Sequence, residues 1–76
     1  MGYYKQYSAE DQLRKNRSLE AMDADELAYA IGNITDTLRD GTSPTRAAED
    51  VHDFYCLDRV SAYKLVNAVA RTEHMK

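Results

Sequence analysis

Apolar residues recur every three or four positions between Leu27 and Leu38, which is the period of an α-helix with one buried face. Asp23 precedes this stretch and is a favourable N-cap, because its carboxylate can accept hydrogen bonds from the free amides of the first turn. Gly41 follows the stretch, where a left-handed residue commonly ends a helix. The pattern predicts a helix over about 24–39, with an inward stripe formed by Leu27, Ile31, Ile34 and Leu38.

Two further helices are predicted in the second half of the chain. Ser43 and Pro44 are typical of a helix start, and they open a predicted helix over about 44–56. The letters "CLD" then turn the chain, and Asp58 caps a last helix over about 59–73. The first of these helices should bury Ala47, Ala48, Val51, Phe54 and Tyr55, and the last should bury Ala62, Tyr63, Leu65, Val66, Val69 and Ala70.

The N-terminal third carries a weaker signal. Ser8 is a plausible cap for a helix over about 9–20, but few apolar residues line its face. Residues 1–22 are therefore expected to be an arm or a weakly packed helix, and residues 23–76 a single helical domain. The region also holds three tyrosines, which either cover the small core or meet a partner: Tyr3, Tyr4 and Tyr7. Since no window alternates like a strand, the predicted fold class is all-α, a small bundle of three to four helices.

Charge is distributed unevenly along the chain. The net charge is −3, yet residues 19–58 hold ten acidic residues against two arginines, while both ends are mildly basic. Such a body repels nucleic acid and anionic membranes unless one basic face is kept separate. A lone Cys56 allows no internal disulfide, and no apolar run approaches the length of a bilayer span. These features predict a cytoplasmic protein without a membrane segment.

The candidate chemistry for catalysis is sparse. His52 and Cys56 are four residues apart, a spacing that would allow a thiolate–imidazolium pair on one helix. A small residue at a helix end is more often a packing residue, so we expect Cys56 to be structural. The remaining His and carboxylates do not form a ligand pattern for a metal, and no glycine-rich phosphate loop is present. We therefore expect a protein that is not an enzyme and that has no metal and no cofactor.

One stretch, "AAEDVHDFYCLDRVSAYKLV", resembles the helix-turn-helix unit of DNA-binding proteins over residues 44–70. It departs from that family at Cys56, where Gly is usual, and at His52, where a small Ala is usual. The resemblance implies that helix 59–73 would lie in the major groove, with a dimer supplying enough base contacts. The residues it would direct to bases or phosphates are Arg59, Ser61, Lys64, Asn67 and Arg71.

A competing interpretation is a protein-binding surface on helix 24–39. By helical periodicity, its outward side gathers four polar residues around one tyrosine: Asp25, Glu26, Tyr29, Asn33 and Asp36. Tyrosine is enriched at interface centres, and carboxylates around it would complement a basic partner, including a nucleic-acid-binding protein. Small acidic phage-encoded inhibitors of host machinery offer an analogy of size and charge. The first choice is therefore a non-enzymatic regulator or inhibitor that binds a protein partner, with DNA binding as the alternative and a homodimer compatible with both.

Overall fold

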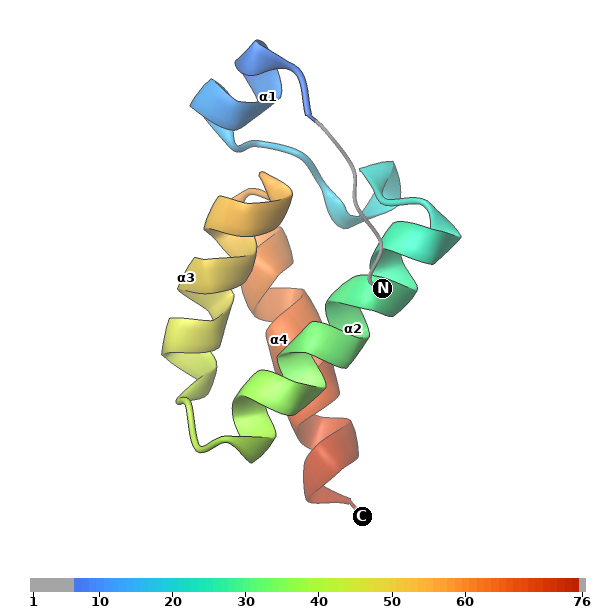
Figure 1. Cartoon of the computed structure of the whole chain (residues 1–76), viewed down its shortest axis with the longest axis vertical. Helices are drawn as coiled ribbons and strands as arrows, with labels where there is room; N and C mark the ends of the chain where they lie inside the picture. Colours follow the sequence, from blue (N-terminus) through green and yellow to red (C-terminus); the bar gives the residue numbers. More distant parts are fainter. Residues whose placement is uncertain (1–6, 76) are drawn as a thin grey trace.

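A computed structural model describes residues 7–75, and about three quarters of these are helical (Figure 1). The all-α class predicted from the sequence is confirmed. The segments in chain order are α1 (Ala9–Arg14), the short 3-10 helix η1 (Leu19–Ala21), α2 (Ala24–Arg39), α3 (Pro44–Tyr55) and α4 (Arg59–His74).

The predicted helix starts and the predicted stop are confirmed by local hydrogen bonds. The side chains of Asp23, Ser43 and Asp58 each accept from the backbone N–H three residues on, at 2.8, 3.2 and 2.7 Å. Each bond satisfies one amide that the first helical turn leaves without a partner. After α2, Gly41 takes a φ of 95°, a conformation that side chains rarely adopt, and the chain reverses into α3.

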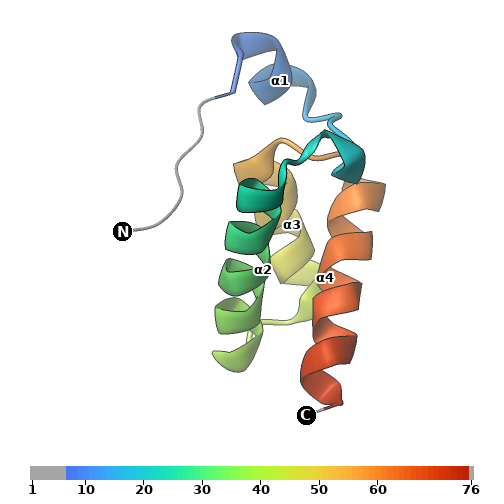
Figure 2. The same cartoon turned by 90° about the vertical axis from the view of Figure 1, so that its right-hand side faces the viewer.

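Helices α2, α3 and α4 form the bundle. α2 and α4 run in broadly the same direction, and α3 returns between them (Figures 1 and 2). The core lies where the three helices meet and is built from small and branched side chains, which permit close helix approach. Its buried members are Met22, Ala30, Ile34, Ala47, Ala48, Val51, Tyr55, Leu57, Ala62, Leu65, Val66 and Val69.

The single helix predicted over about 9–20 is wrong. α1 ends at Arg14, because Lys15 adopts a left-handed φ of 48°, and the chain then runs on to η1. α1 buries none of its residues, and Leu13 is 85% exposed. Tyr3 and Tyr4 lie outside the described residues.

Two apolar side chains predicted for the core are exposed instead. Ile31 borders a shallow hollow between α2 and α4, and Phe54 is 60% exposed. At 100° per residue, Phe54 is turned about 60° from Val51 and 100° from Tyr55, which places it at the edge of the buried side of α3. Periodicity alone did not separate this edge from the centre of the stripe.

Candidate functional site

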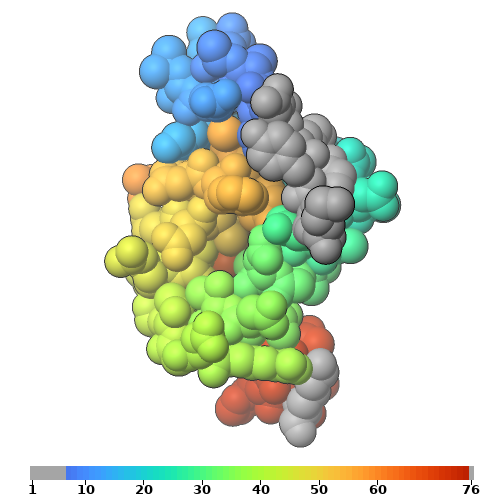
Figure 3. Space-filling model, viewed as in Figure 1, coloured from blue at the N-terminus to red at the C-terminus, as the bar shows by residue number. Residues whose placement is uncertain are grey.

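A groove runs between α2 and α3 and is visible as the hollow between the green and yellow segments in Figure 3. Its volume is about 320 Å³, near the lower end of the range for ligand-binding clefts. Its floor is apolar, and polar side chains stand around it. The lining residues are Asn33, Ile34, Asp36, Thr37 and Asp40 from α2 and the connection that follows it, and Ala47, Asp50, Val51, Phe54 and Tyr55 from α3.

The charge around this groove is negative on both sides. Asp36 and Asp40 come from the α2 side and Asp50 from α3, while none of the described lining residues is basic. Within residues 7–75, Asp36 and Asp40 have no ion-pair partner, whereas Asp50 lies 3.4 Å from Arg46 one turn earlier on α3. The groove therefore presents two carboxylates that form no ion pair within the described residues, and Asp36 is attracted only at longer range by Arg39.

A hydrogen bond and a ring contact fix one end of the groove. The Asn33 amide donates to the Tyr55 hydroxyl at 2.9 Å, linking α2 to α3. Burial raises the pKa of Tyr55, so this hydroxyl stays neutral at physiological pH. The Phe54 ring meets the Tyr55 ring edge-on, with centroids 4.8 Å apart and planes at 81°. Phe54 is therefore held beside the groove although most of its surface faces solvent.

The residues predicted as a partner-binding surface on α2 separate into two groups. Asp25, Asn33 and Asp36 are exposed, and the last two line the groove. Placing Glu26 on the outward side was wrong, because its side chain is fully buried. Glu26 precedes buried Ala30 by one helical turn and therefore lies on the same inward side.

Tyr29 was also predicted to point away from the core, and this too is wrong. Its side chain is half-buried and packs against the core cluster. Of the ten residues that line the groove, the sequence-based prediction assigned only Asn33 and Asp36 to a binding surface, and those it missed include Asp40, Asp50 and Phe54. Their signal was the angular offset of Phe54 from the α3 stripe, together with Asp36 and Asp40 one turn apart on the α2 side.

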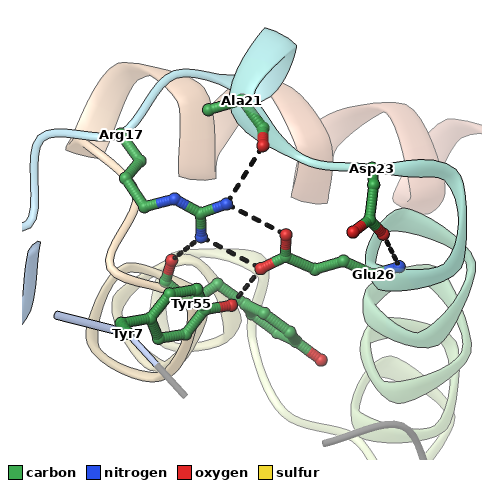
Figure 4. Close-up of polar contacts among 6 residues, drawn as sticks. All are labelled: Tyr7, Arg17, Ala21, Asp23, Glu26 and Tyr55. Carbon is green, nitrogen blue, oxygen red and sulfur yellow. Dashed lines mark hydrogen bonds and ion pairs between the residues drawn. The ribbon is translucent and has the colours of Figure 1, made fainter. Parts of the chain in front are cut away.

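The buried Glu26 carboxylate belongs to a polar cluster that ties residues 7–22 to the bundle (Figure 4). Arg17 donates from both terminal nitrogens to the two Glu26 oxygens, each at 2.9 Å, and also to the carbonyls of Tyr55 at 2.8 Å and Ala21 at 3.2 Å. The hydrogen bond to Glu26 raises the pKa of Arg17. The Tyr7 hydroxyl donates to Glu26 as well, and the Tyr7 ring stacks 4.5 Å from the Arg17 guanidinium.

The corner between α3 and α4 is held by the same arginine. The Arg17 backbone accepts from Asp58 at 2.8 Å and donates to Cys56 at 3.1 Å, a two-bond bridge across Leu57. Cys56 itself adopts the left-handed conformation, with φ of 56°, that glycine usually supplies at such a corner. His52 Nδ1 donates to the Leu57 carbonyl at 2.6 Å. The two departures from the helix-turn-helix pattern are thus accommodated in the turn.

The residues implied by that resemblance lie differently along α4. Lys64, Asn67 and Arg71 are exposed on one face at helical spacing. Arg59 is exposed too, but its guanidinium pairs with Glu49 of α3. Placing Ser61 on the outward side was wrong, because Ser61 precedes buried Leu65 by one turn and is itself buried. Within the described part of α4, no exposed residue is acidic.

The remaining candidate chemistry is weaker. Burial raises the pKa of the Cys56 thiol, the opposite of what a thiolate nucleophile needs, and His52 Nδ1 is engaged with a carbonyl. Among residues 7–75 there is no group of three or more His, Cys, Asp or Glu side chains placed to hold a metal ion. In the same range, no helix combines the length and the apolar composition needed to cross a bilayer.

Comparison of the chain with protein-family models, curated protein sequences and solved structures found no match.

Proposed function

We propose that this protein is a small non-enzymatic binding protein that engages a protein partner with a basic surface through the acidic groove between α2 and α3. One observation carries the proposal. An apolar hollow is bordered by Asp36, Asp40 and Asp50, and within the described residues the first two have no ion-pair partner. Charge complementarity of this kind steers a basic partner and sets specificity, while the exposed ring of Phe54 supplies apolar area that binding can bury.

The position of these carboxylates on α2 supports the same proposal. Asp36 lies in the last turns of α2 and Asp40 is its C-cap. The C-terminus of a helix carries partial negative charge, so acidic side chains there are unfavourable for the helix itself. Such violations of a local stability rule are expected at functional positions. A basic surface is also what nucleic-acid-binding proteins present, so stoichiometric blocking of such a partner would give a regulator or inhibitor.

The test is capture of partners from lysate of the source cells, with and without nuclease treatment, by the wild-type chain and two charge-reversal variants. Asp36→Lys/Asp40→Lys reverses the groove, and Glu10→Lys/Glu20→Lys makes the same change in net charge at exposed positions elsewhere. We expect a protein retained by the wild type and by the second variant and lost by the first. Equal retention by all three, or recovery of nucleic acid alone, would overturn the proposal.

A second candidate function is DNA binding through α4, favoured by one specific observation. Lys64, Asn67 and Arg71 lie on one face of α4, and none of the exposed residues that the structure describes in α4 is acidic. The protein as a whole is nevertheless acidic. Cys56 adopts the left-handed conformation at the corner between α3 and α4, the position where the helix-turn-helix pattern usually has glycine. These side chains are of the types that pair with guanine, adenine or phosphate.

This second candidate predicts duplex binding that weakens steeply as salt rises, because phosphate contacts release counterions. Lys64→Glu/Arg71→Glu should remove the binding. Arg14→Glu/Arg46→Glu, which makes an equal charge change at exposed positions off this face, should weaken it only slightly. Absence of any shift of duplex DNA at low salt by the wild-type protein would refute the DNA-binding candidate.

A further inference from the structure

We infer that the occupant of the α2–α3 groove is an amphipathic helix of the partner, whose apolar stripe is flanked on both sides by Lys or Arg. This inference rests on the proposed function and adds the chemical form of the partner segment. It is carried by the length of the groove, by the placement of charge on its two sides and by one exposed aromatic side chain.

The length of the groove corresponds to two turns of helix. The lining residues on one side run from Asn33 to Asp40, and on α3 they run from Ala47 to Tyr55. Seven residues of helix rise about 10 Å. Two turns of a docked helix would present apolar anchors at i, i+3 or i+4, and i+7 over the same distance. The floor beneath them consists of Ile34, Ala47 and Val51, each at most 5% exposed, so the anchors would lie over this floor and bury chiefly the ring of Phe54.

The charges define the flanks of that segment. Asp36 and Asp40 stand on the α2 side of the floor and Asp50 on the α3 side. A segment seated on the floor would therefore pass between carboxylates on both sides. A partner segment with cations on both sides of one apolar stripe would pair with these carboxylates. A helix can carry such a pattern, because residues at i, i+3 and i+4 lie on neighbouring positions of its surface. An extended partner strand would bind by adding to a free sheet edge. Within residues 7–75 the one β-type contact is the Arg17–Leu57 bridge, and neither of these residues lines the groove.

Phe54 is the expected centre of the contact. Its ring is 60% exposed, yet its edge-on packing against Tyr55 limits its rotamers. An aromatic side chain that is already ordered loses little conformational entropy when it is covered, which is the property of interface hot spots. An apolar anchor from the partner would pack between this ring and the floor formed by Ile34, Ala47 and Val51.

The test uses a synthetic probe, a fluorescein-labelled peptide of about 14 residues with leucines at helical spacing and lysines on both flanks. A scrambled peptide of the same composition keeps the charge and removes the stripe. Fluorescence anisotropy should show the patterned peptide binding at least about tenfold tighter than the scrambled one. Phe54→Ser should erase this difference. The matched control is Val60→Ser, which alters a side chain that is 66% exposed on α4 away from the groove, and it should leave the difference unchanged.

The outcomes separate this inference from the proposed function. Equal binding of both peptides, still lost in Asp36→Lys/Asp40→Lys, would overturn the helix inference and leave acidic-surface binding standing. Equal binding of both peptides that also survives the charge reversal would overturn both the helix inference and the proposed function. Folding of Phe54→Ser is checked by its far-ultraviolet circular dichroism. Should that variant unfold, mapping of amide chemical shifts in the wild type decides the matter, with shifts expected at 33–40 and 47–55. Shifts confined to α4, or a wild-type dimer that excludes the peptide from the groove, would contradict the inference.

Discussion

Removal of Arg17 tests how the N-terminal segment holds the bundle. The Arg17 side chain is 9% exposed, and the four hydrogen bonds of its guanidinium join the buried Glu26 carboxylate to two carbonyls from different parts of the chain. Arg17→Met keeps much of the apolar stem and removes the charge and every one of these donors. The buried Glu26 carboxylate would then lose the positive charge of Arg17, and the carbonyl of Tyr55 would lose a donor.

The expected cost follows from two magnitudes. Breaking a buried ion pair by deleting one partner costs about 3–5 kcal/mol, because the remaining charge stays desolvated. A domain of this length has a total free energy of unfolding of roughly 4–11 kcal/mol. Arg17→Met should therefore remove a large fraction of the stability. The matched double variant Arg17→Met/Glu26→Leu leaves no buried charge, so it should recover more than half of the loss.

Urea unfolding followed by circular dichroism at the helical band measures both effects, with the free energy compared at constant slope. The coupling energy from the double-mutant cycle isolates the pair from the other contacts of each residue. A cost below about 1 kcal/mol for Arg17→Met, the value typical of an exposed pair, would refute this account of the cluster. So would strictly additive losses in the double variant.

Further predictions concern the corner, alkaline pH and the groove. Cys56→Gly should be less destabilising than Cys56→Ala in urea unfolding, because Gly adopts the left-handed φ of 56° without strain, although it buries less surface. The reverse order would contradict backbone strain at the corner. Burial raises the pKa values of Cys56 and Tyr55 above their ordinary 9.0 and 10.0, so the unfolded chain loses these protons first. Stability should be full below pH 9 and fall as pH rises above it, and Cys56→Ala should remove the part of the fall between pH 9 and 10; a flat profile of melting temperature over this range would oppose the prediction. Asp40→Lys should raise stability by about 0.3–1 kcal/mol in urea unfolding, because it places a cation at the C-terminus of α2, while it weakens groove binding; a stability loss would show that Asp40 has a structural role.

The helices were predictable because their signals are local. The caps Asp23, Ser43 and Asp58 act within three residues of themselves, and the apolar period of α2, α3 and α4 needs no distant contact. The misplacement of Glu26 has the opposite cause. A carboxylate is buried only when a partner compensates it, and Arg17 reaches Glu26 from a non-helical segment whose path no local pattern describes.

The groove was only half predictable for the same physical reason. Asn33 and Asp36 were recognised as exposed residues of one helix, but a groove needs the crossing of α2 with α3, which periodicity does not supply. Phe54 illustrates the limit, since a residue at the edge of an apolar stripe is buried or exposed according to how its neighbour helix is placed. Cys56 shows a further limit of prediction from sequence, because a non-glycine residue in the left-handed conformation is held by contacts that lie elsewhere in the chain.

The most direct test of the central claim is the affinity of the patterned basic peptide for three proteins at low salt, measured by anisotropy. The proteins are the wild type, Asp36→Lys/Asp40→Lys and the equally charged Glu10→Lys/Glu20→Lys. Binding through the groove predicts a dissociation constant at least about tenfold weaker for the first variant and close to wild type for the second. Equal weakening in both variants would mean that only net charge attracts the peptide, and it would contradict the claim that the groove between α2 and α3 is the binding site.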